Sequence, residues 1–414
     1  MQNYVEVKEN KYNIQILIYS NSNLSAEEII TKKVKERFGT NVTSVGLYFI
    51  KLDEKLANGL NPENHPTLTL VWQTLASIRV AIHSQFLMPC DIFVDTMGVG
   101  YCYPFLKLLF PCKVYAYVHY PIVSSDMVNV VASGKQQFNN KQTSLATRLF
   151  KIVYYNIMIV LYKICGWFAD IVACNSSWTR AHIDELWSVE PKRCRTIFPP
   201  CDTEFYIKGI RPEGGRREIT DKAMPKERAE EVMKQDKKRQ NLVVSFAQFR
   251  PEKDHPLQLR VWSNVLKNYD VPKDAKFVMM GAVRGPADQK IVDDLKKQAK
   301  ELGILDRVDF KTNLPRNDIL DYFSVAKVAM HTMRDEHFGI AIVEQMASGI
   351  ITIAHNSAGP RKDILGVSTK RIGFLADDEA KYTKFVGQSL INFETEEYVK
   401  IRVDARDYVH NKFS

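Results

Sequence analysis

The sequence is poor in cysteine, and its cysteines follow no regular spacing. No Cys-x-x-Cys pair occurs among the seven, so the sequence supports neither a disulfide scaffold nor a zinc module. We expect a reducing environment in which these residues act as small apolar side chains. They are Cys90, Cys102, Cys112, Cys165, Cys174, Cys194 and Cys201.

Long hydrophobic runs are also scarce. Residues 1–12 are polar and charged, which argues against a secretory signal peptide. The nearest approach to a membrane span is the segment 149–167, but Lys151, Asn156 and Lys163 interrupt it. Two interpretations stay open for this segment: an aromatic-rich helix that lies in a bilayer interface, or a core helix whose lysines reach out to solvent.

The excess of positive charge is moderate. The 57 Lys and Arg residues against 48 Asp and Glu give a net charge of +9 at pH 7. With 45% hydrophobic and 25% charged residues, the 414-residue chain is composed like an ordinary globular protein, which excludes a disordered or collagen-like chain. The length predicts two or three domains or one long α/β assembly. A basic surface attracts nucleotides, nucleic acid or acidic lipid without choosing among them.

Short apolar segments alternate with stretches of helical character in the first half of the chain. Segments rich in Val, Ile, Tyr and Phe and bounded by turn residues predict buried strands. These segments are residues 13–20, 42–50, 91–96, 113–120 and 170–175. Between the first two, Ile29, Ile30 and Val34 recur at helical spacing and predict a helix over 25–38.

A second alternating unit follows residues 208–240, whose crowded charges of both signs favour an exposed insertion or linker over a nucleic-acid arm. The later strands are predicted at 242–249, 276–283, 308–313, 325–332 and 350–356. Helices are predicted at 255–269, 288–302 and 339–349, with a short one from Arg316 and a loop at 357–363. Near-continuous apolar strands separated by helices are typical of parallel sheets covered on both faces. We therefore expect two doubly wound α/β halves that meet near residue 205 and face a cleft.

The segment 330–349 is the most informative for chemistry. In an open α/β sheet, ligands bind outside the carboxyl ends of strands, where helix N-termini present N–H groups to anions. Gly339 would let a phosphate or sugar approach the backbone. Glu344 lies in an apolar run, where a carboxylate needs a partner, and a ribose diol is one such partner. The alternative is that Glu336 and Glu344 are eight apart by chance and Glu344 faces solvent.

Two cations follow the strand predicted at 242–249. Arg250 could bind a diphosphate through paired N–H groups, and Lys253 as a point charge. A pair of solvated surface charges is the alternative. His119, at the end of the strand predicted at 113–120, could hydrogen-bond a sugar hydroxyl or stabilise a leaving group, although a lone histidine is more often structural.

Several segments together resemble a known family. The segment 336–349, EHFGIAIVEQMASG, is similar to the E-x7-E signature of retaining glycosyltransferases with the GT-B fold. With five further segments, it resembles the endoplasmic-reticulum α-1,2-mannosyltransferases of asparagine-linked glycosylation. These segments are AQFRPEKDHPLQLR (247–260), CNSSWTRAHI (174–183), FPPCD (198–202), YVHYPIVSSDM (117–127) and AHNSAGPRKDI (354–364). The resemblance runs from about residue 13 to 414 and is interrupted by the charged insertion.

The resemblance implies a donor, an acceptor and a place in the cell. It implies transfer of the fourth and fifth mannoses from GDP-mannose to a dolichol-diphosphate-linked oligosaccharide. The catalytic domains would lie on the cytosolic face of the endoplasmic reticulum membrane, in contact with the membrane surface. Other mannosyltransferases of the pathway are candidate partners. Neither a metal, another cofactor nor nucleic acid is expected. A GT-B transferase with a UDP-sugar donor and a non-catalytic scaffold are the alternatives.

The resemblance also implies roles for individual residues. Glu344 matches the glutamate that binds the nucleotide ribose, and Glu336 the one near the donor hexose. Lys253 matches the diphosphate lysine, and Arg250 a second cation beside it. His119 matches a histidine near the donor sugar. The backbone of Phe338, Gly339 and Ile340 would face the sugar and the diphosphate.

Four regions are expected from this likeness. Residues 1–205 would form a membrane-facing acceptor domain, and 206–240 a charged insertion. Residues 241–395 would form the nucleotide-sugar domain, and 396–414 a C-terminal helix. Family members also have an N-terminal anchor, a first strand, a glycine-rich loop and a longer C-terminal helix, so we expect the first domain and the last helix to be incomplete here.

Overall fold

The computed structural model describes residues 14–20, 22, 24–30, 34, 46–61, 64–124, 127–128, 131–132, 144–188, 190, 192–208 and 239–414. Most of the charged insertion expected at 208–240, and most of the helix expected at 25–38, therefore lie outside the described residues. By its contacts the chain forms two compact units. The first contains residues 1–95, 99–116 and 157–170, and the second contains 96–98, 117–156 and 171–414.

The strands of the first half form two separate sheets. β1 (Ile16–Ser20) and β2 (Leu47–Lys51) pair in parallel as a two-stranded sheet. A four-stranded sheet has the order β3-β4-β5-β6, with strands β3 (Ile92–Asp95), β4 (Lys113–Val118), β5 (Ile171–Cys174) and β6 (Cys194–Thr196). Four of the five strands expected here are confirmed closely, and the second at its C-terminal part. Among the described residues they divide between the two sheets.

Seven helices are described up to residue 208. They are α2 (Ala26–Glu28), α4 (Glu54–Leu60), α5 (Thr69–Leu87), α6 (Tyr103–Leu109), α8 (Leu145–Gly166), α9 (Ser177–Trp187) and α10 (Thr203–Lys208). α9 begins at a Ser176 N-cap, whose hydroxyl oxygen accepts from the N–H of Thr179 at 3.0 Å. Only part of this helical content was visible as a pattern in the sequence.

Helix α8 exposes a long apolar stripe. Among the described residues it is the one helix long and apolar enough to cross a membrane, and little of it is buried. Its exposed apolar residues recur every three or four positions and include Leu145, Leu149, Val153, Ile157, Val160 and Ile164. The interpretation of 149–167 as a core helix is therefore wrong.

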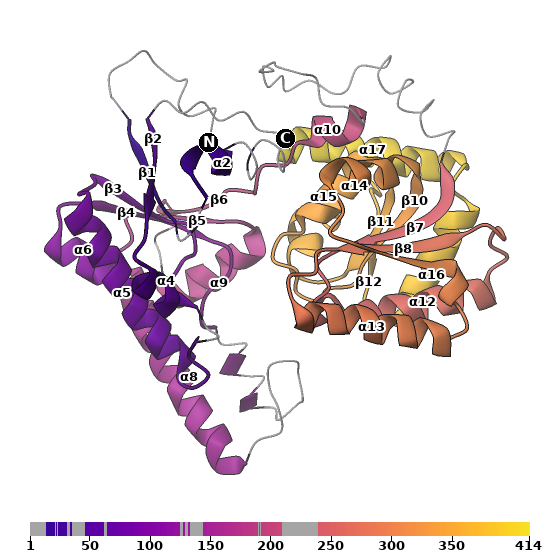
Figure 1. The fold of residues 1–414 in the computed structure, drawn as a ribbon. Coiled ribbons are helices and arrows are strands. Elements are labelled where there is room, and N and C mark those ends of the chain that lie inside the picture. The colour runs from indigo at the N-terminus through magenta and orange to yellow at the C-terminus, as the bar shows by residue number, and fades with distance from the viewer. Residues whose placement is uncertain are drawn as a thin grey trace. The chain divides into compact units, whose positions relative to one another are not determined.

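The second half is built on a six-stranded parallel sheet with the order β12-β11-β10-β7-β8-β9 (Figure 1). The strands are β7 (Gln240–Phe246), β8 (Lys276–Gly281), β9 (Val308–Thr312), β10 (Ala326–His331), β11 (Ile351–His355) and β12 (Phe374–Ala376). Numbered from β7, this is the Rossmann order, in which the strand order reverses between β7 and β10. All five predicted strands are confirmed, and β12 was not predicted.

Helices cover both faces of this sheet. They are α12 (His255–Asn268), α13 (Pro286–Glu301), α14 (Arg316–Val325), α15 (Ile340–Ala347), α16 (Glu379–Ile391) and α17 (Glu396–Phe413). One core cluster contains Trp262 and Phe277, under α12, α13 and α16, and the other contains Phe323 and Ile342, under α14, α15 and α17 (Figure 1). The loop expected at 357–363 is instead partly a π-helical turn, Pro360–Ile364.

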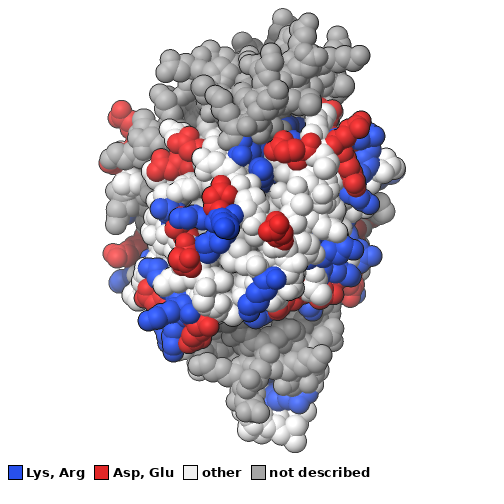
Figure 2. All heavy atoms as spheres, turned by 90° about the vertical axis from the view of Figure 1, so that its right-hand side faces the viewer, with Lys and Arg blue, Asp and Glu red and all other residues white. Residues whose placement is uncertain are grey.

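The described surface of the second half mixes both signs of charge. On the face that Figure 2 shows, Lys and Arg side chains lie among Asp and Glu side chains and do not gather into one basic patch. Ion pairs of the second half include Arg371 with Glu397 and Lys370 with Asp404. This face therefore lacks the basic stripe that is typical of nucleic-acid-binding proteins.

Candidate active site

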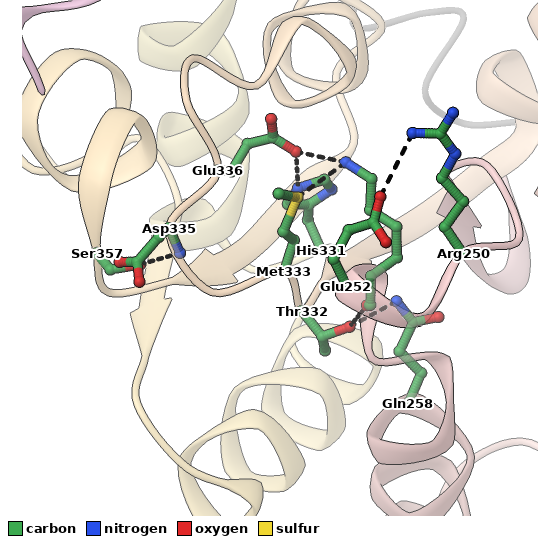
Figure 3. A network of polar contacts seen from close by, with 10 residues as sticks. Arg250, Glu252, Gln258, His331, Thr332, Met333, Asp335, Glu336 and Ser357 are labelled. Atoms are coloured by element: carbon green, nitrogen blue, oxygen red, sulfur yellow. Dashed lines mark hydrogen bonds and ion pairs between the residues drawn. The ribbon is translucent and has the colours of Figure 1, made fainter. Parts of the chain in front are cut away.

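Two loops meet at the carboxyl ends of neighbouring parallel strands. β7 and β10 pair in parallel, so the loops that follow them lie side by side. The Thr332 hydroxyl donates to the Lys253 carbonyl at 2.7 Å and accepts from Gln258 Nε2 at 2.8 Å (Figure 3). These bonds tie the start of the loop after β10 to the loop after β7 and to α12.

Glu336 is the centre of this site. Its Oε2 accepts from Lys253 Nζ at 2.7 Å and lies 3.0 Å from His331 Nε2 (Figure 3). The three side chains are only 15%, 17% and 4% exposed. Burial alone would raise the pKa of Glu336, but the hydrogen bond and charge of His331, followed by those of Lys253, hold that pKa well below its usual range. Glu336 is therefore a carboxylate at neutral pH.

The two predicted cations have different acidic partners in this structure. Lys253 ends a short 3₁₀ turn, Pro251–Lys253, and its ammonium also lies 3.0 Å from Met333 Sδ. Arg250 Nη1 instead lies 3.5 Å from Glu252 Oε1 (Figure 3). The structure thus brings Lys253 to Glu336 and leaves Arg250 in a separate pair.

The N-terminus of α15 follows directly from this loop. Gly339 has φ +101°, and a Cβ there would lie 2.8 Å from Ile342 Cδ1, so the turn requires glycine. Phe338 is buried, with ring centroids 5.5 Å from Phe198 and 5.3 Å from Phe413. Ile340 is exposed. At this position only the backbone of Phe338 is available to a ligand, because its ring is part of the core.

A further segment braces the same loop. The N–H of Gly359 donates to the Glu336 carbonyl at 3.0 Å, and the Ser357 hydroxyl accepts from the N–H of Asp335 at 2.8 Å (Figure 3). A Cβ on Gly359 would lie 2.6 Å from the carbonyl oxygens of both His337 and Phe338. The close approach of these two backbones fixes the path of the loop that carries Glu336.

Glu344 lies outside the Glu336 network. Its Oε1 accepts a hydrogen bond from the Tyr206 hydroxyl at 2.8 Å. Burial raises the pKa of Glu344 to about 7, although that hydrogen bond and the charge of Arg316 oppose the rise. The alternative that Glu344 merely faces solvent is therefore wrong, and the partner it holds in this structure comes from α10.

His119 directly follows β4, as predicted. Its carbonyl accepts from the Thr179 hydroxyl at 3.0 Å, and its ring meets the Tyr117 ring edge-on with centroids 5.0 Å apart. Burial lowers the pKa of His119, which favours the neutral imidazole. A neutral imidazole can both donate and accept hydrogen bonds, as contact with a sugar would require.

A stack of rings in the second unit was missed in the sequence. The Tyr120 ring lies nearly parallel to His337, with centroids 4.4 Å apart, and Trp178 lies 5.6 Å from the same histidine. Burial lowers the pKa of His337, and Lys253 and His119 add to the effect while Glu336 opposes it. All three residues of the stack lie in the segments 117–127, 174–183 and 336–349 that carry the family resemblance, but none of them was singled out there.

The expectation of catalysis without a metal stays a prediction. Among the described residues, no group of three or more His, Cys, Asp or Glu side chains is arranged to hold a metal ion. In this chain, the ammonium of Lys253 and the imidazole of His331 lie beside Glu336.

Comparison with known proteins identifies both halves. Residues 3–187 match the family described as ALG11 mannosyltransferase N-terminus, and residues 227–390 match glycosyl transferases group 1. A Dictyostelium discoideum protein named GDP-Man:Man(3)GlcNAc(2)-PP-Dol alpha-1,2-mannosyltransferase is 34% identical over 403 residues, which cover 95% of this chain and 74% of that protein. A Homo sapiens protein of the same name is 36% identical over 363 residues, which cover 84% of this chain and 68% of that protein.

Solved structures identify the fold. A glycosyltransferase from Rickettsia africae ESF-5 superposes with a TM-score of 0.58 at 15% identity, covering 97% of this chain and 95% of that one. The chain therefore has the GT-B fold that the sequence predicted. At this level of identity, the likeness indicates the fold alone.

Proposed function

Because the chain belongs to the family of GDP-Man:Man(3)GlcNAc(2)-PP-Dol alpha-1,2-mannosyltransferases, we propose that it transfers mannose from GDP-mannose, in α-1,2 linkage, to a dolichol-diphosphate-linked oligosaccharide. In this proposal the transfer retains the anomeric configuration, needs no metal and adds the fourth and fifth mannoses. The observation that carries it is the pair of Lys253 and Glu336 at the carboxyl ends of β7 and β10, in a chain at 34–36% identity to such enzymes.

The diphosphate of the donor would replace Glu336 as the partner of Lys253. The ammonium now donates to Glu336, and a diphosphate oxygen can replace that carboxylate as its acceptor. A fixed positive charge stabilises the negative charge that develops on the leaving diphosphate. Arg250 would reach the same diphosphate after leaving Glu252, and the backbone of 338–340 would donate N–H groups at the start of α15.

The sugar and the ribose would meet the two carboxylates. Glu336 is ionised at neutral pH, so it can accept hydroxyl hydrogen bonds from the hexose and stabilise positive charge at the anomeric carbon. Glu344 would accept the two vicinal hydroxyls of the ribose. His119, as a neutral imidazole, would hydrogen-bond a hydroxyl of the donor sugar.

The test uses the full chain. Calorimetry with GDP, UDP and ADP measures the donor base, and a transfer assay with GDP-mannose and a dolichol-linked oligosaccharide measures the activity. We expect a preference for GDP and transfer of mannose. A preference for UDP would support a UDP-sugar transferase, and nucleotide binding without any transfer would support a non-catalytic scaffold.

The proposed function divides the chain into four regions. The acceptor domain would span 1–205, the insertion 206–240, the donor domain 241–395 and the last helix 396–414. The family matches at 3–187 and 227–390 support two such halves.

The acceptor is a membrane lipid, so the enzyme would dock on the cytosolic face of the endoplasmic reticulum membrane. The exposed apolar stripe of α8, with Lys151 and Lys163 on the same helix, supports an interfacial helix. We expect the chain to sediment with vesicles that contain anionic lipid, and less so at high salt. Ile157→Asp on the stripe should reduce sedimentation, whereas Ile391→Asp, at an exposed apolar position on α16, should not.

A further inference from the structure

The segment that precedes the charged insertion supplies a side chain to the donor half. α10 contains Tyr206, whose hydroxyl donates to Glu344 Oε1 at 2.8 Å across a long separation in sequence. Tyr206 is 7% exposed, so its ring is part of the core beneath α15. A residue expected to open the linker instead contacts the glutamate predicted to bind ribose.

Neighbouring side chains hold the Tyr206 ring in place. The Phe205 ring meets it edge-on with centroids 5.2 Å apart, and Phe323 lies on another side at 6.1 Å. Arg316 covers the Phe205 ring, with Cζ 3.9 Å from its centroid, and its Nη2 lies 3.7 Å from Asp202 Oδ2. A ring enclosed in this way keeps its hydroxyl directed at Glu344 without a large loss of entropy on binding.

We propose that Tyr206 is a positioning residue whose hydroxyl holds the Glu344 carboxylate in the orientation that receives a ribose diol. This inference rests on the proposed function, because it takes Glu344 to be the ribose ligand. The hydroxyl of Tyr206 is a single donor, so the carboxylate retains acceptor capacity for two further hydroxyls. A protonated Glu344 would lose part of that capacity.

The charges around Glu344 make its ionisation sensitive to this one hydrogen bond. The titratable and charged side chains near it are Cys201, Asp202 and Tyr206 in the segment up to α10, Arg316 at the start of α14, and Arg239 and Arg406, which donate to the Ser348 carbonyl at the end of α15. Burial and Asp202 raise the pKa of Glu344, and Tyr206 and Arg316 lower it, to a balance at about 7. Removal of the hydroxyl therefore shifts the titration to higher pH.

The test is Tyr206→Phe, which keeps the ring and removes the hydroxyl. The dissociation constant for GDP is measured by calorimetry between pH 6 and pH 9 on the full chain. Tyr322→Phe on α14 is the matched control, because that residue packs against the same core. The titration of the GDP phosphate is common to all variants and cancels in their ratios.

We expect wild-type affinity to rise as the pH passes 7, and the rise in Tyr206→Phe to be displaced upward. At pH 7 the variant should bind GDP about 5- to 10-fold more weakly, as about one pKa unit implies, and it should approach wild type at pH 9. The kcat should change little. Tyr322→Phe should follow wild type at every pH.

A second variant guards against a folding defect. Incorporation of 3,5-difluorotyrosine at position 206 keeps the ring and strengthens the donor, so the affinity profile should move to lower pH. If Tyr206→Phe binds as wild type does at every pH while Glu344→Gln binds weakly, the positioning role is overturned and the ribose role stands. If Glu344→Gln itself binds GDP as tightly as wild type, the ribose role of the proposed function fails.

Discussion

Glu336 and Glu344 lie eight residues apart, yet their surroundings are opposite. Glu336 is in a loop at the end of β10, where the ammonium of Lys253 and the imidazole of His331 hold it. Glu344 is inside α15, where its partner is the neutral hydroxyl of Tyr206. Their pKa values consequently move in opposite directions, one well below the usual range and the other up to about 7.

The eight-residue spacing of the two glutamates does not by itself reveal that their surroundings differ. A carboxylate held by an ammonium and an imidazole stays ionised, and a phosphate can replace it as the acceptor of the ammonium. A carboxylate in a helix that meets a tyrosine is suited to recognition, because it is fixed and partly desolvated. We therefore expect variants of the two regions to affect different kinetic constants.

The largest effect should come from removing the cation of the first region. Lys253→Ala should lower kcat by about 100-fold or more, because it removes a preorganised charge at the leaving group. Lys267→Ala, on the exposed side of α12, is the matched control and should leave kcat unchanged. A normal kcat in Lys253→Ala would show that the surroundings of Glu336 contribute no more to the chemical step than those of Glu344.

The second test separates KM from kcat. Glu344→Gln should raise KM for the donor while kcat changes little, because a ribose contact acts in ground and transition states alike. The loss of about 1.5–3 kcal/mol for a charge-assisted hydrogen bond corresponds to about 10- to 150-fold. Glu336→Gln should instead lower kcat. The same pattern of KM and kcat in both variants would contradict the division of roles.

The third test uses pH and stability. Folding raises the pKa of Glu344 from 4.5 to about 7, so its stabilising contribution is present below pH 4.5 and is lost as the pH rises towards 7. Folding lowers the pKa of Glu336, so its contribution is present above pH 4.5 and is lost at lower pH.

Thermal unfolding at pH 5 and pH 8 measures both contributions. At pH 8, Glu344→Gln should stabilise the chain by about 1–2 kcal/mol, since a buried charge is removed. At the same pH, Glu336→Gln should destabilise it by about 1–3 kcal/mol, since Lys253 and His331 lose an ionic partner. Equal shifts of Tm in both variants would show that the two sites have similar electrostatics.

The smallest effect is expected from chelation. EDTA should leave the transfer rate unchanged, because Lys253 and the N-terminus of α15 would balance the charge of the diphosphate. Rates measured before and after dialysis against EDTA, and then with added Mg²⁺ or Mn²⁺, provide the check. A rate that depends on added metal would mean that the cations of the first region are insufficient.

Much of the second half could be predicted from the sequence. Its strands are continuous apolar runs bounded by turn residues, and its helices have clear periodicity, as with Ile291 and Leu295 on α13. Two glycines at helix ends were also predicted: Gly339 precedes α15, and Gly303, with φ +70°, follows α13. The separate β1–β2 sheet could not be predicted, because strand periodicity does not reveal which strands pair.

The sequence predicted the residues of the candidate site but not which of them contact one another. Lys253 and Glu336 follow different strands, and the sequence placed both at the carboxyl edge of one sheet. The sequence offered no reason to join Glu344 to Tyr206, because that contact depends on α10 packing against α15. Arg250 was expected to bind a diphosphate together with Lys253, and in this structure its Nη1 lies 3.5 Å from Glu252 Oε1.

Helix α17 determines when the donor half can be completed during synthesis. Its Arg406 donates to the Ser348 carbonyl at 3.2 Å, and the carbonyl of Phe413 accepts from the N–H of Cys201 at 3.1 Å. The residues that start α10 therefore leave the ribosome long before the helix that covers them, at about 5–20 residues per second. Until residues 396–413 emerge, the apolar side chains of α17 cannot complete the core cluster that contains Phe205.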